Sequence, residues 1–276
     1  MQLFNVKTAN LSPNQIKIAD YINRHLQDVL LSTEKEIAEA LNVSTASVSR
    51  FWKSVGFLNL KDFKRRMREM DVTPVGNFEK AMERLTAHEW QHDQLEQGMA
   101  NLKETMRHLS ASQFDTAIEA LVKAETVYIY SPGPSKGLGV LMHHRLKRFG
   151  LNIVHMTSSG SDILEDMVHF KQGDLVVLFG FVRMLSEAKV ILDDAKKRGY
   201  QTLLITDQLI SEFTGKVDIQ LFSSRGERTD FHSMIGPTFL IENVILAVGM
   251  KKETEALTHL KSLTQLRSMY ADELPR

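Results

Sequence analysis

The chain has 276 residues, of which 43% are hydrophobic and 25% are charged, as in a globular protein with one large or two ordinary domains. Its 34 basic and 34 acidic side chains leave no net charge. The absence of cysteine excludes disulfides, thiolate catalysis and cysteine-ligated metal sites. No window approaches the roughly 18 apolar residues of a membrane span, and the first residues lack an apolar signal segment. We therefore expect a cytoplasmic protein without a membrane partner.

The first predicted helix begins at Ser12, which is followed by a proline at the first helical position and by Gln15. Its core side carries Ile16, Ala19, Ile22 and Leu26. The next stretch, residues 32–57, predicts two short helices joined by a tight turn, which is a helix-turn-helix. Thr33 and Glu36 form a capping box at its start, Asn42 tolerates the left-handed turn, and Ser44 can cap the second helix.

The second helix of this pair has an apolar side and a hydroxyl-rich, basic side. Val48, Trp52 and Val55 recur at helical spacing and predict a core face, with Phe51 beside them. The opposite side suits a DNA major groove, where hydroxyls and guanidinium groups meet bases and phosphates. The alternative is a solvated face on a small helical domain. The candidate DNA-binding residues, which include two cations of the following helix, are Ser44, Thr45, Ser47, Ser49, Arg50, Lys53, Lys64 and Arg65.

The predicted helix at 58–70 is basic. Between Arg50 and Arg68 there are seven basic residues against one acid, Asp62, which gives this end of a neutral chain a footprint for a polyanion. Together, the helices to this point make a four-helix head of about 70 residues. Residues 73–76, with a proline and a glycine, predict a boundary, after which 77–123 has a helical pattern. This segment contains an HExxH match at residues 88–92, but no third zinc ligand accompanies it, so we expect no metal.

From residue 126 the pattern changes to short apolar runs that alternate with helices. Such alternation predicts a parallel sheet covered on both faces, with ligands bound beyond the carboxyl ends of the strands. The predicted strands are 126–131, 152–156, 174–179, 201–206 and 218–222, and the predicted intervening helices are 137–149, 161–169, 185–198 and 209–214. Past residue 236 the chain is predicted to be helical to its end, with an apolar stripe at Leu257, Leu260, Leu263 and Leu266 that either closes the core or pairs with another subunit.

The loop after the first strand is rich in glycine, serine and proline. It has no GxGxxG or Walker spacing, but it exposes backbone N–H groups at a helix N-terminus, where phosphates commonly bind. Ser135 and Lys136 add a hydroxyl and a charge there. A plain strand-to-helix turn is the alternative. No Ser/His/Asp set or pair of carboxylates predicts a catalytic residue, and we expect no cofactor.

The order of these parts resembles a known family. The runs LSPNQIKIADYINRH, STEKEIAEALNVSTASVSRFWKSVGF and LKDFKRRM are similar to the N-terminal domain of RpiR-type bacterial transcriptional regulators, and the later half resembles their sugar isomerase (SIS) domain. The resemblance implies an N-terminal all-α helix-turn-helix bundle and a C-terminal five-stranded parallel α/β SIS (flavodoxin-like) sandwich. It also implies a homodimer or homotetramer that binds a double-stranded DNA operator and senses a phosphosugar. On this basis the expected divisions are a DNA-binding domain at 1–73, a helical linker at 74–109 and a SIS domain at 110–276.

The resemblance is uneven at the effector site. Gly133 and Ser135 match the family's loop after the first strand, and Glu187 matches the end of the family's Ser-x-Ser-Gly-x-Thr-x-Glu run. The hydroxyl residues of that run are replaced by Gly180, Val182 and Leu185. In one alternative, Arg183 binds another anion through its bidentate guanidinium, with Ser158, Ser159 or Arg225 from neighbouring loops. In the other, Phe181, Met184 and Leu185 fill the pocket, which then accepts a more apolar ligand or none. The candidate effector-binding residues are Gly133, Ser135, Lys136, Ser158, Ser159, Arg183 and Glu187.

Three functions compete at this point. The first is a regulator of bacterial sugar or related catabolic genes that responds to a small anionic effector, and it is the one we favour. The second is a phosphosugar isomerase-like SIS enzyme, which the missing phosphate-binding hydroxyls disfavour. The third is a regulator with a non-functional pocket, whose sheet domain acts only as a dimerisation scaffold.

Overall fold

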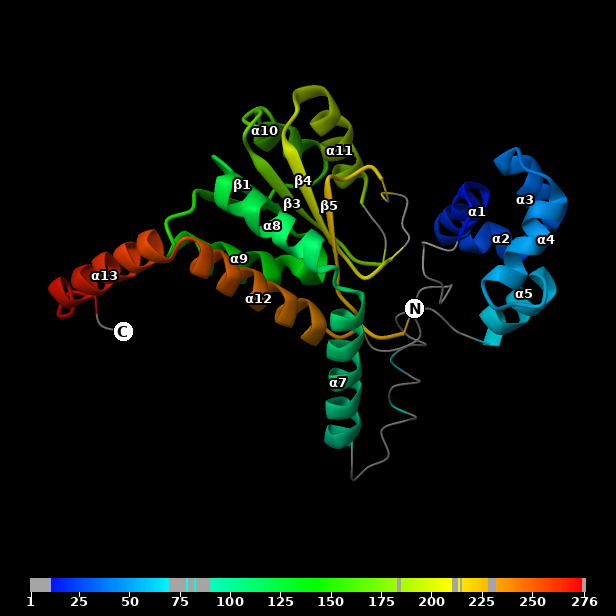
Figure 1. The fold of residues 1–276 in the computed structure, drawn as a ribbon, viewed down its shortest axis with the longest axis horizontal. Coiled ribbons are helices and arrows are strands. Elements are labelled where there is room, and N and C mark those ends of the chain that lie inside the picture. The colour runs from blue at the N-terminus through cyan, green and yellow to red at the C-terminus, as the bar shows by residue number, and fades with distance from the viewer. Residues whose placement is uncertain are drawn as a thin grey trace. The chain divides into compact units, whose positions relative to one another are not determined.

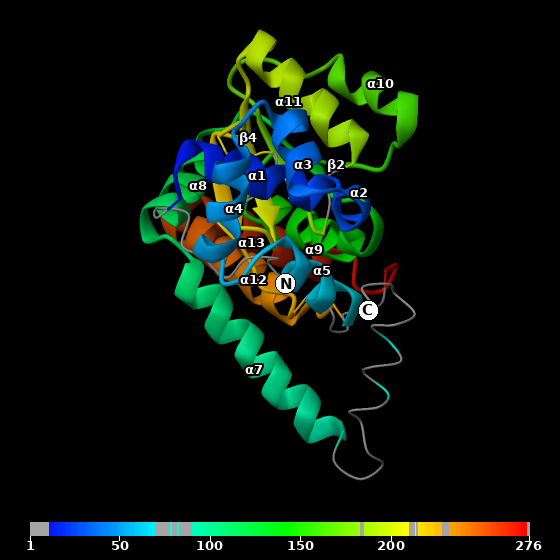
Figure 2. The same ribbon diagram turned by 90° about the vertical axis from the view of Figure 1, so that its right-hand side faces the viewer.

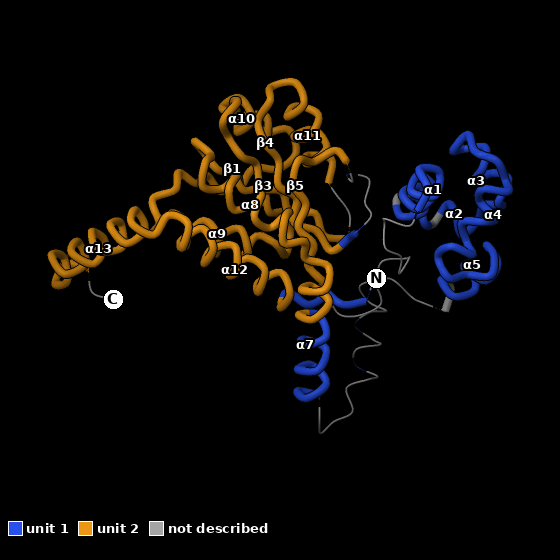
Figure 3. Tube along the Cα trace, viewed as in Figure 1, with its two compact units in different colours: residues 1–101, 208–214, 225–234 blue, residues 102–207, 215–224, 235–276 orange. Residues whose placement is uncertain are grey.

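The structure is a computed structural model that describes residues 11–69, 78, 82, 90–182, 185–209, 213, 215–227 and 232–274. The chain is divided into two compact units (Figure 3). The first comprises residues 1–101, 208–214 and 225–234, and the second comprises residues 102–207, 215–224 and 235–276.

The described part of the head contains α1 (Pro13–Arg24), α2 (Leu26–Leu31), α3 (Glu34–Leu41), α4 (Thr45–Ser54) and α5 (Leu60–Glu69). This part of the chain therefore has five helices, so the prediction of a four-helix head was wrong. The predicted first helix is interrupted at His25, whose backbone leaves the helical region at φ −120° and ψ 38°. The His25 ring lies 4.7 Å from that of Tyr21, one turn earlier in the chain.

The predicted helix caps of the head are confirmed. Ser12 and Gln15 form a complete capping box at α1, and Thr33 and Glu36 form another at α3. Asn42 ends α3 in the left-handed region at φ 52°. The Ser44 hydroxyl accepts a hydrogen bond from the Ser47 N–H at the start of α4. These local bonds fix where each helix of the helix-turn-helix begins and ends.

The head surrounds an apolar core that the helical spacing predicted in large part. Val48, Phe51 and Trp52 of α4 are fully buried. The Trp52 ring lies 4.8 Å from that of Phe63 on α5, which in turn packs edge-on against Phe57 at 5.2 Å. Aromatic packing of this kind holds α4 and α5 together, so the opposite side of α4 is left facing solvent.

The second unit is built on a five-stranded parallel sheet of order β2-β1-β3-β4-β5, and all five predicted strands are confirmed. In the register of the sheet, Tyr130 pairs with Met156 on one side and with Leu178 on the other. Every residue of β1 and β3 is buried, as expected for central strands covered on both faces. The strands are β1 (Val127–Tyr130), β2 (Ile153–Met156), β3 (Leu175–Gly180), β4 (Gln201–Thr206) and β5 (Ile219–Phe222).

Helices cover both faces of this sheet (Figures 1 and 2). One face is covered by α8 (Ala111–Lys123), α9 (Lys136–Lys147) and α12 (Ile235–Lys251), and the other by α10 (Ile163–Met167) and α11 (Ser186–Arg198). The helical pattern at 77–123 was predicted to continue without a break. In the structure, residues 109 and 110 separate α7 (Trp90–His108) from α8. The predicted C-terminal helix is likewise divided into α12 and α13 (Glu253–Met269). Most of the helix predicted at 209–214 lies outside the described residues.

Candidate functional site

One candidate site is the face of α4 that points away from the head core. Thr45, Ser49, Arg50 and Lys53 are all exposed, while the apolar side of the same helix is buried. The structure therefore brings the short polar side chains and the two cations together on one surface. A helix with this division can lie with its polar side in a major groove while its apolar side holds it to the domain.

Ser44 and Ser47, at the start of α4, have local partners. The Ser44 Oγ accepts a hydrogen bond from the Ser47 N–H at 3.2 Å and lies 2.8 Å from the Ser47 Oγ. Ser44 is exposed and Ser47 half-buried. In the structure, Ser44 caps α4 by satisfying a backbone N–H in its first turn.

Ser49 has a partner that the sequence analysis did not identify. Its hydroxyl donates a hydrogen bond of 2.7 Å to the Glu34 Oε2 at the start of α3. The bond ties the two helices of the helix-turn-helix together, but it also places a carboxylate beside the predicted DNA-binding face. A carboxylate in that position repels phosphate, so it weakens attraction to any DNA sequence alike.

Lys64 and Arg65 on α5 are engaged within the head. The Lys64 Nζ donates a hydrogen bond of 2.7 Å to the Ser32 carbonyl, and the Arg65 Nη2 lies 2.8 Å from the Asp62 Oδ1. The Leu58 N–H, then Arg65 and Arg66, hold the pKa of the Asp62 carboxyl below its usual value. Both predicted phosphate-binding cations therefore also stabilise the fold, and Arg65 keeps an exposed side chain.

The second candidate site lies where the carboxyl ends of β1 and β3 meet. The strand order places these two neighbours at the point where the connections turn in opposite directions, which is where ligands bind in open parallel sheets. The loop after β1, residues 131–136 and here called the β1 loop, leads into α9. The chain after β3 leads into α11, so two helix N-termini approach this edge.

The β1 loop contains three of the predicted effector residues. Gly133 adopts a left-handed conformation at φ 58°, which favours glycine. Ser135 is buried, and its hydroxyl donates a hydrogen bond of 2.6 Å to the Pro132 carbonyl. Lys136 is exposed at the first turn of α9. The loop therefore places a cation at a helix N-terminus, where an anion can bind. The Ser135 hydroxyl already donates its proton to Pro132, so it has no second proton to donate to a ligand.

Glu187, in the first turn of α11, connects the end of β1 with the segment that follows β2. Its Oε1 accepts a hydrogen bond of 3.0 Å from the Gly160 N–H, and its carboxylate also accepts one from the Tyr130 hydroxyl. Its own N–H and that of Gly160 hold the pKa of Glu187 below its usual value, while burial and the Glu187 charge raise the pKa of Tyr130 to about 12. The nearby Ser158 is half-buried and Ser159 is exposed.

The loop after β3 is described only in part. Arg183, the predicted guanidinium of the site, lies outside the described residues. Val182 adopts a left-handed backbone at φ 63°, and its N–H donates a hydrogen bond of 2.9 Å to the Asp207 Oδ1 at the end of β4. A β-branched residue rarely adopts this conformation, so the bond to Asp207 marks a backbone held away from its preferred geometry.

A serine–histidine pair beside the β1 loop was not predicted. The Ser131 Oγ lies 2.8 Å from the His155 Nε2 on β2. Burial, then His143 and Lys136, lower the pKa of His155. The two residues are 24 positions apart, so only the pairing of β1 with β2 brings them together.

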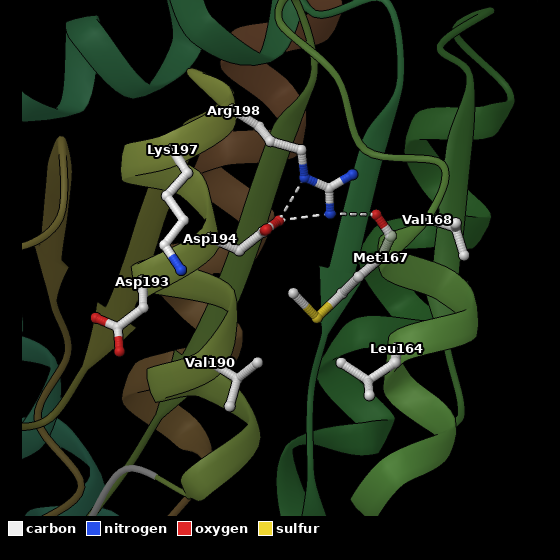
Figure 4. A pocket seen from close by; sticks show the side chains of 8 residues that line it. All are labelled: Leu164, Met167, Val168, Val190, Asp193, Asp194, Lys197 and Arg198. Atoms are coloured by element: carbon white, nitrogen blue, oxygen red, sulfur yellow. Dashed lines mark hydrogen bonds and ion pairs between the residues drawn. The ribbon is translucent and has the colours of Figure 1, made fainter.

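A cavity of about 440 Å³ lies between α10 and α11 (Figure 4). Arg198 lines this cavity and connects the two helices: it pairs with Asp194 on α11 and donates a hydrogen bond of 2.6 Å to the Met167 carbonyl on α10. Because α11 ends at Arg198, shortly before β4 begins, this cavity is near the amino ends of the strands. It is lined by Leu164, Met167, Val168, Val190, Asp193, Asp194, Lys197 and Arg198, a set that contains none of the predicted effector residues.

Within residues 11–69, 90–182 and the later described stretches, no group of three His, Asp or Glu side chains is placed to hold a metal ion. In the same described parts of the chain, no helix is both long and apolar enough to cross a membrane.

Comparisons with known proteins agree with the geometry of both units. A family model for the helix-turn-helix domain of the rpiR family matches residues 1–73, and a model for the SIS domain matches residues 120–250. An uncharacterized HTH-type transcriptional regulator of Caldanaerobacter subterraneus subsp. tengcongensis is 25% identical over 276 residues, which cover 95% of this chain and 94% of that protein.

Two solved structures show the same fold. The sugar isomerase domain of an RpiR transcription factor from Sphaerobacter thermophilus has a TM-score of 0.60 and 21% identity, and the match covers 64% of this chain and 99% of that one. The Vibrio vulnificus NanR protein complexed with ManNAc-6P has a TM-score of 0.58 and 18% identity, with 94% of each chain covered.

Proposed function

Because the chain belongs to the RpiR family of transcriptional regulators, with its helix-turn-helix domain followed by a SIS domain, we propose that it controls bacterial sugar or related catabolic genes in response to a small anionic effector. Its DNA-binding domain is residues 1–73, its linker 74–109 and its SIS domain 110–276. The observation that carries the proposal is the division of α4 into a buried apolar side and an exposed side with hydroxyls and cations.

In this proposal α4 reads the operator. Arg50 and Lys53 contact guanine or phosphate, Thr45 and Ser49 meet base edges, and the capped N-terminus formed by Ser44 and Ser47 faces phosphate. Lys64 and Arg65 add phosphate contacts beyond their bonds within the head. Two heads in a homodimer or homotetramer would read half-sites about one helical turn, ~34 Å, apart.

The DNA-binding proposal is tested with an operator selected from random duplexes by the wild-type protein. We expect Arg50→Ala to lower the preference for selected over random DNA by about tenfold, since one bidentate base contact contributes about 1–3 kcal/mol. Lys35→Ala, a change of an exposed cation on α3, is the control and should keep the preference. Fluorescence anisotropy measures both affinities. An equal loss on selected and random DNA for Arg50→Ala would remove Arg50 from sequence reading.

The effector site in this proposal is the edge where β1 and β3 end. Lys136 and the N-terminus of α9 attract an anion, with Gly133 allowing close approach of the β1 loop. Ser158 and Ser159 come from the loop after β2 and Glu187 from the first turn of α11, and Arg183 is the proposed guanidinium. The NanR structure contains a sugar phosphate, which supports an effector of phosphosugar-like chemistry here. The replaced hydroxyls at residues 180, 182 and 185 favour a different member of that class.

A thermal-shift screen of the whole protein tests the effector class. Sugar phosphates, amino-sugar phosphates, sugar acids and nucleotides are the probes. A true effector raises the unfolding midpoint as its concentration increases. At one hundred times its Kd, it adds about 2.7 kcal/mol to the free energy of unfolding. Lys136→Ala should reduce the shift, and Lys147→Ala, at the opposite end of α9, should not. A probe that stabilises wild type and Lys136→Ala equally would place the site elsewhere.

A second function is favoured by one observation. The Ser135 hydroxyl and the Glu187 carboxylate are already bonded within the chain, so the pocket has fewer groups to offer an effector. This supports a regulator whose sheet domain serves as a dimerisation scaffold. The isomerase alternative has less support, because two of the relatives that align over most of the chain are named as HTH-type transcriptional regulators. Turnover of any ketose or aldose phosphate would revive it.

A further inference from the structure

The base of the β1 loop is held by a contact between two strands and one helix. Ser131 follows β1 directly and is buried, and its Oγ lies 2.8 Å from the His155 Nε2 on β2. Since β2 is the edge strand beside β1, the histidine supports the loop from the side. The first residue of the β1 loop is therefore held by a titratable side chain.

Gly139 on α9 lies directly against Ser131 and His155. A Cβ added to Gly139 would lie 2.7 Å from the His155 Nε2 and 2.8 Å from the Ser131 Cβ, and it would collide with the Ser131 Oγ. Distances this short do not occur between real atoms of these kinds. The helix can approach the Ser131–His155 pair only because residue 139 has no side chain. In contrast, a Cβ added to Gly137 of the same helix meets nothing within 4 Å.

The charged and titratable groups that act on His155 come from the same helix. Lys136 and His143 of α9 both oppose a positive imidazole, burial acts in the same direction, and β1 contributes the uncharged Ser131. The pKa of His155 is consequently lower than usual, so the imidazole is neutral around pH 7. An anion bound beside Lys136 would offset that repulsion and favour the imidazolium.

We propose that Ser131, His155 and Gly139 form a proton-linked support for the β1 loop, through which an anion held by this loop binds more tightly when His155 is protonated. The inference rests on the proposed anionic effector at this edge of the sheet. His155 is a positioning residue in this arrangement, since it acts on the anion through Ser131 and through its charge. By linkage, a ligand that favours the protonated form is itself bound better by that form.

Sulfate is the probe for this linkage because it keeps both charges across the range, whereas a phosphate has its second pKa near 6. The Kd for sulfate, from thermal shifts of the full chain, is measured at about pH 8 and about pH 5.5 at constant ionic strength. Each unit by which bound sulfate raises the pKa of His155 gives about a tenfold lower Kd for the protonated protein. Wild type should bind sulfate several-fold more tightly at the lower pH, and His155→Gln should lose that dependence.

His155→Gln keeps a nitrogen near the position of Nε2, so its hydrogen bond to Ser131 survives while the titration disappears. An unchanged pH dependence in this variant would overturn the inference. Failure of wild type to bind either sulfate or any sugar phosphate would overturn the proposed effector function and this inference with it. Binding by wild type with identical behaviour of the variant would overturn the inference alone.

Gly139→Ala and Gly137→Ala provide a second, independent test in which the same substitution is made two residues apart. We expect Gly139→Ala to raise the Kd for sulfate at about pH 5.5 by about tenfold and to flatten the pH dependence, because the added methyl group displaces Ser131 from His155. Gly137→Ala should behave as wild type. Equal sulfate binding by the two alanine variants would contradict the proposal.

Discussion

In the proposed function, Glu34 both supports the DNA-reading helix α4 and limits the affinity of that helix for DNA. Its carboxylate accepts the Ser49 hydroxyl at 2.7 Å and so positions α4 against α3. The same charge lies beside the exposed cations that we propose to meet DNA. A carboxylate near phosphate costs binding free energy that is independent of base sequence and is screened by salt. In the proposed function, Glu34 therefore lowers the total affinity for DNA without changing the preference between sequences.

Replacing Glu34 by glutamine separates these two roles, because the amide oxygen still accepts the Ser49 hydroxyl while the charge is removed. We expect Glu34→Gln to tighten binding to random and selected DNA alike, by about threefold at low salt and less at high salt. Fluorescence anisotropy at two salt concentrations measures this. Glu39→Gln, at the exposed far end of α3, is the control and should have little effect. A gain confined to the selected DNA would contradict the electrostatic explanation.

Asp62 predicts a pH dependence of the head. The Leu58 N–H, then Arg65 and Arg66, lower the pKa of this carboxyl, so its contribution to stability is present above the unfolded value of about 3.9 and is lost as the pH falls below it. We expect Asp62→Asn to destabilise the head at pH 7 and to approach wild type near pH 3. Of the two tryptophans, Trp52 is in the head core, so urea unfolding followed by fluorescence in a Trp90→Phe background reports on the head. A deficit of equal size at both pH values would contradict this account.

At the scale of elements, the turn between α3 and α4 depends on a single backbone conformation. Asn42 adopts φ 52° and ψ 50°, and its N–H donates to the carbonyls of Ala38 and Glu39. The conformation directs the chain from one helix into the next, and Ser44 then starts α4. The orientation of the polar face of α4 therefore depends on a residue that tolerates the left-handed region.

The substitution pair Asn42→Gly and Asn42→Ala tests this dependence. Alanine pays about 1–2 kcal/mol to adopt a left-handed backbone, whereas glycine adopts it without that penalty. We expect Asn42→Ala to lower the free energy of unfolding of the head by about 1 kcal/mol relative to Asn42→Gly. Urea unfolding followed by Trp52 fluorescence provides the comparison. Equal stability of the two variants would show that the turn has rearranged.

Those elements that follow from local spacing were predicted, and those that depend on distant contacts were not. The capping residues Ser12, Thr33 and Ser44 bond to N–H groups three residues away, so their roles are visible in the sequence. The strands were predicted because each is a short apolar run between helices. In contrast, the pairing of Ser131 with His155 depends on the β1–β2 register, which no local pattern encodes. The break at His25 was missed because the apolar spacing continues through it.

The site predictions divide in the same way. The exposed residues of α4 follow from helical periodicity and lie together as expected. Glu34 and Tyr130 were missed, since each is brought to its site by the packing of separate elements. Lys64 was predicted as a phosphate contact from charge alone, and its bond to the Ser32 carbonyl appears only in the folded head. The assignments of effector residues remain predictions.

At the scale of the whole molecule, the second unit presents an apolar surface on its last helix, α13. In Figure 1, α13 extends away from the sheet. Leu257 is 47% exposed and Leu266 is 52% exposed, while Leu260 and Leu263 are half-buried. Exposed leucines at helical spacing on a projecting helix are typical of a surface that another helix covers. An operator with two half-sites requires two heads, so a second copy of this chain is the occupant that the proposed function needs.

The double substitution Leu257→Glu with Leu266→Glu tests this role of α13. If a second copy covers the stripe, burying two carboxylates in the interface is strongly unfavourable, and we expect the protein to dissociate into monomers at micromolar concentration. Sedimentation equilibrium measures the mass. Thr258→Glu with Ser262→Glu adds the same charge at exposed polar positions of the same helix and should leave the assembly intact. Because an operator of two half-sites gains affinity from linked heads, the dissociated variant should also lose about a hundredfold in operator affinity while each head keeps its preference for a half-site. An unchanged mass for the leucine variant would show that the subunits associate through another surface.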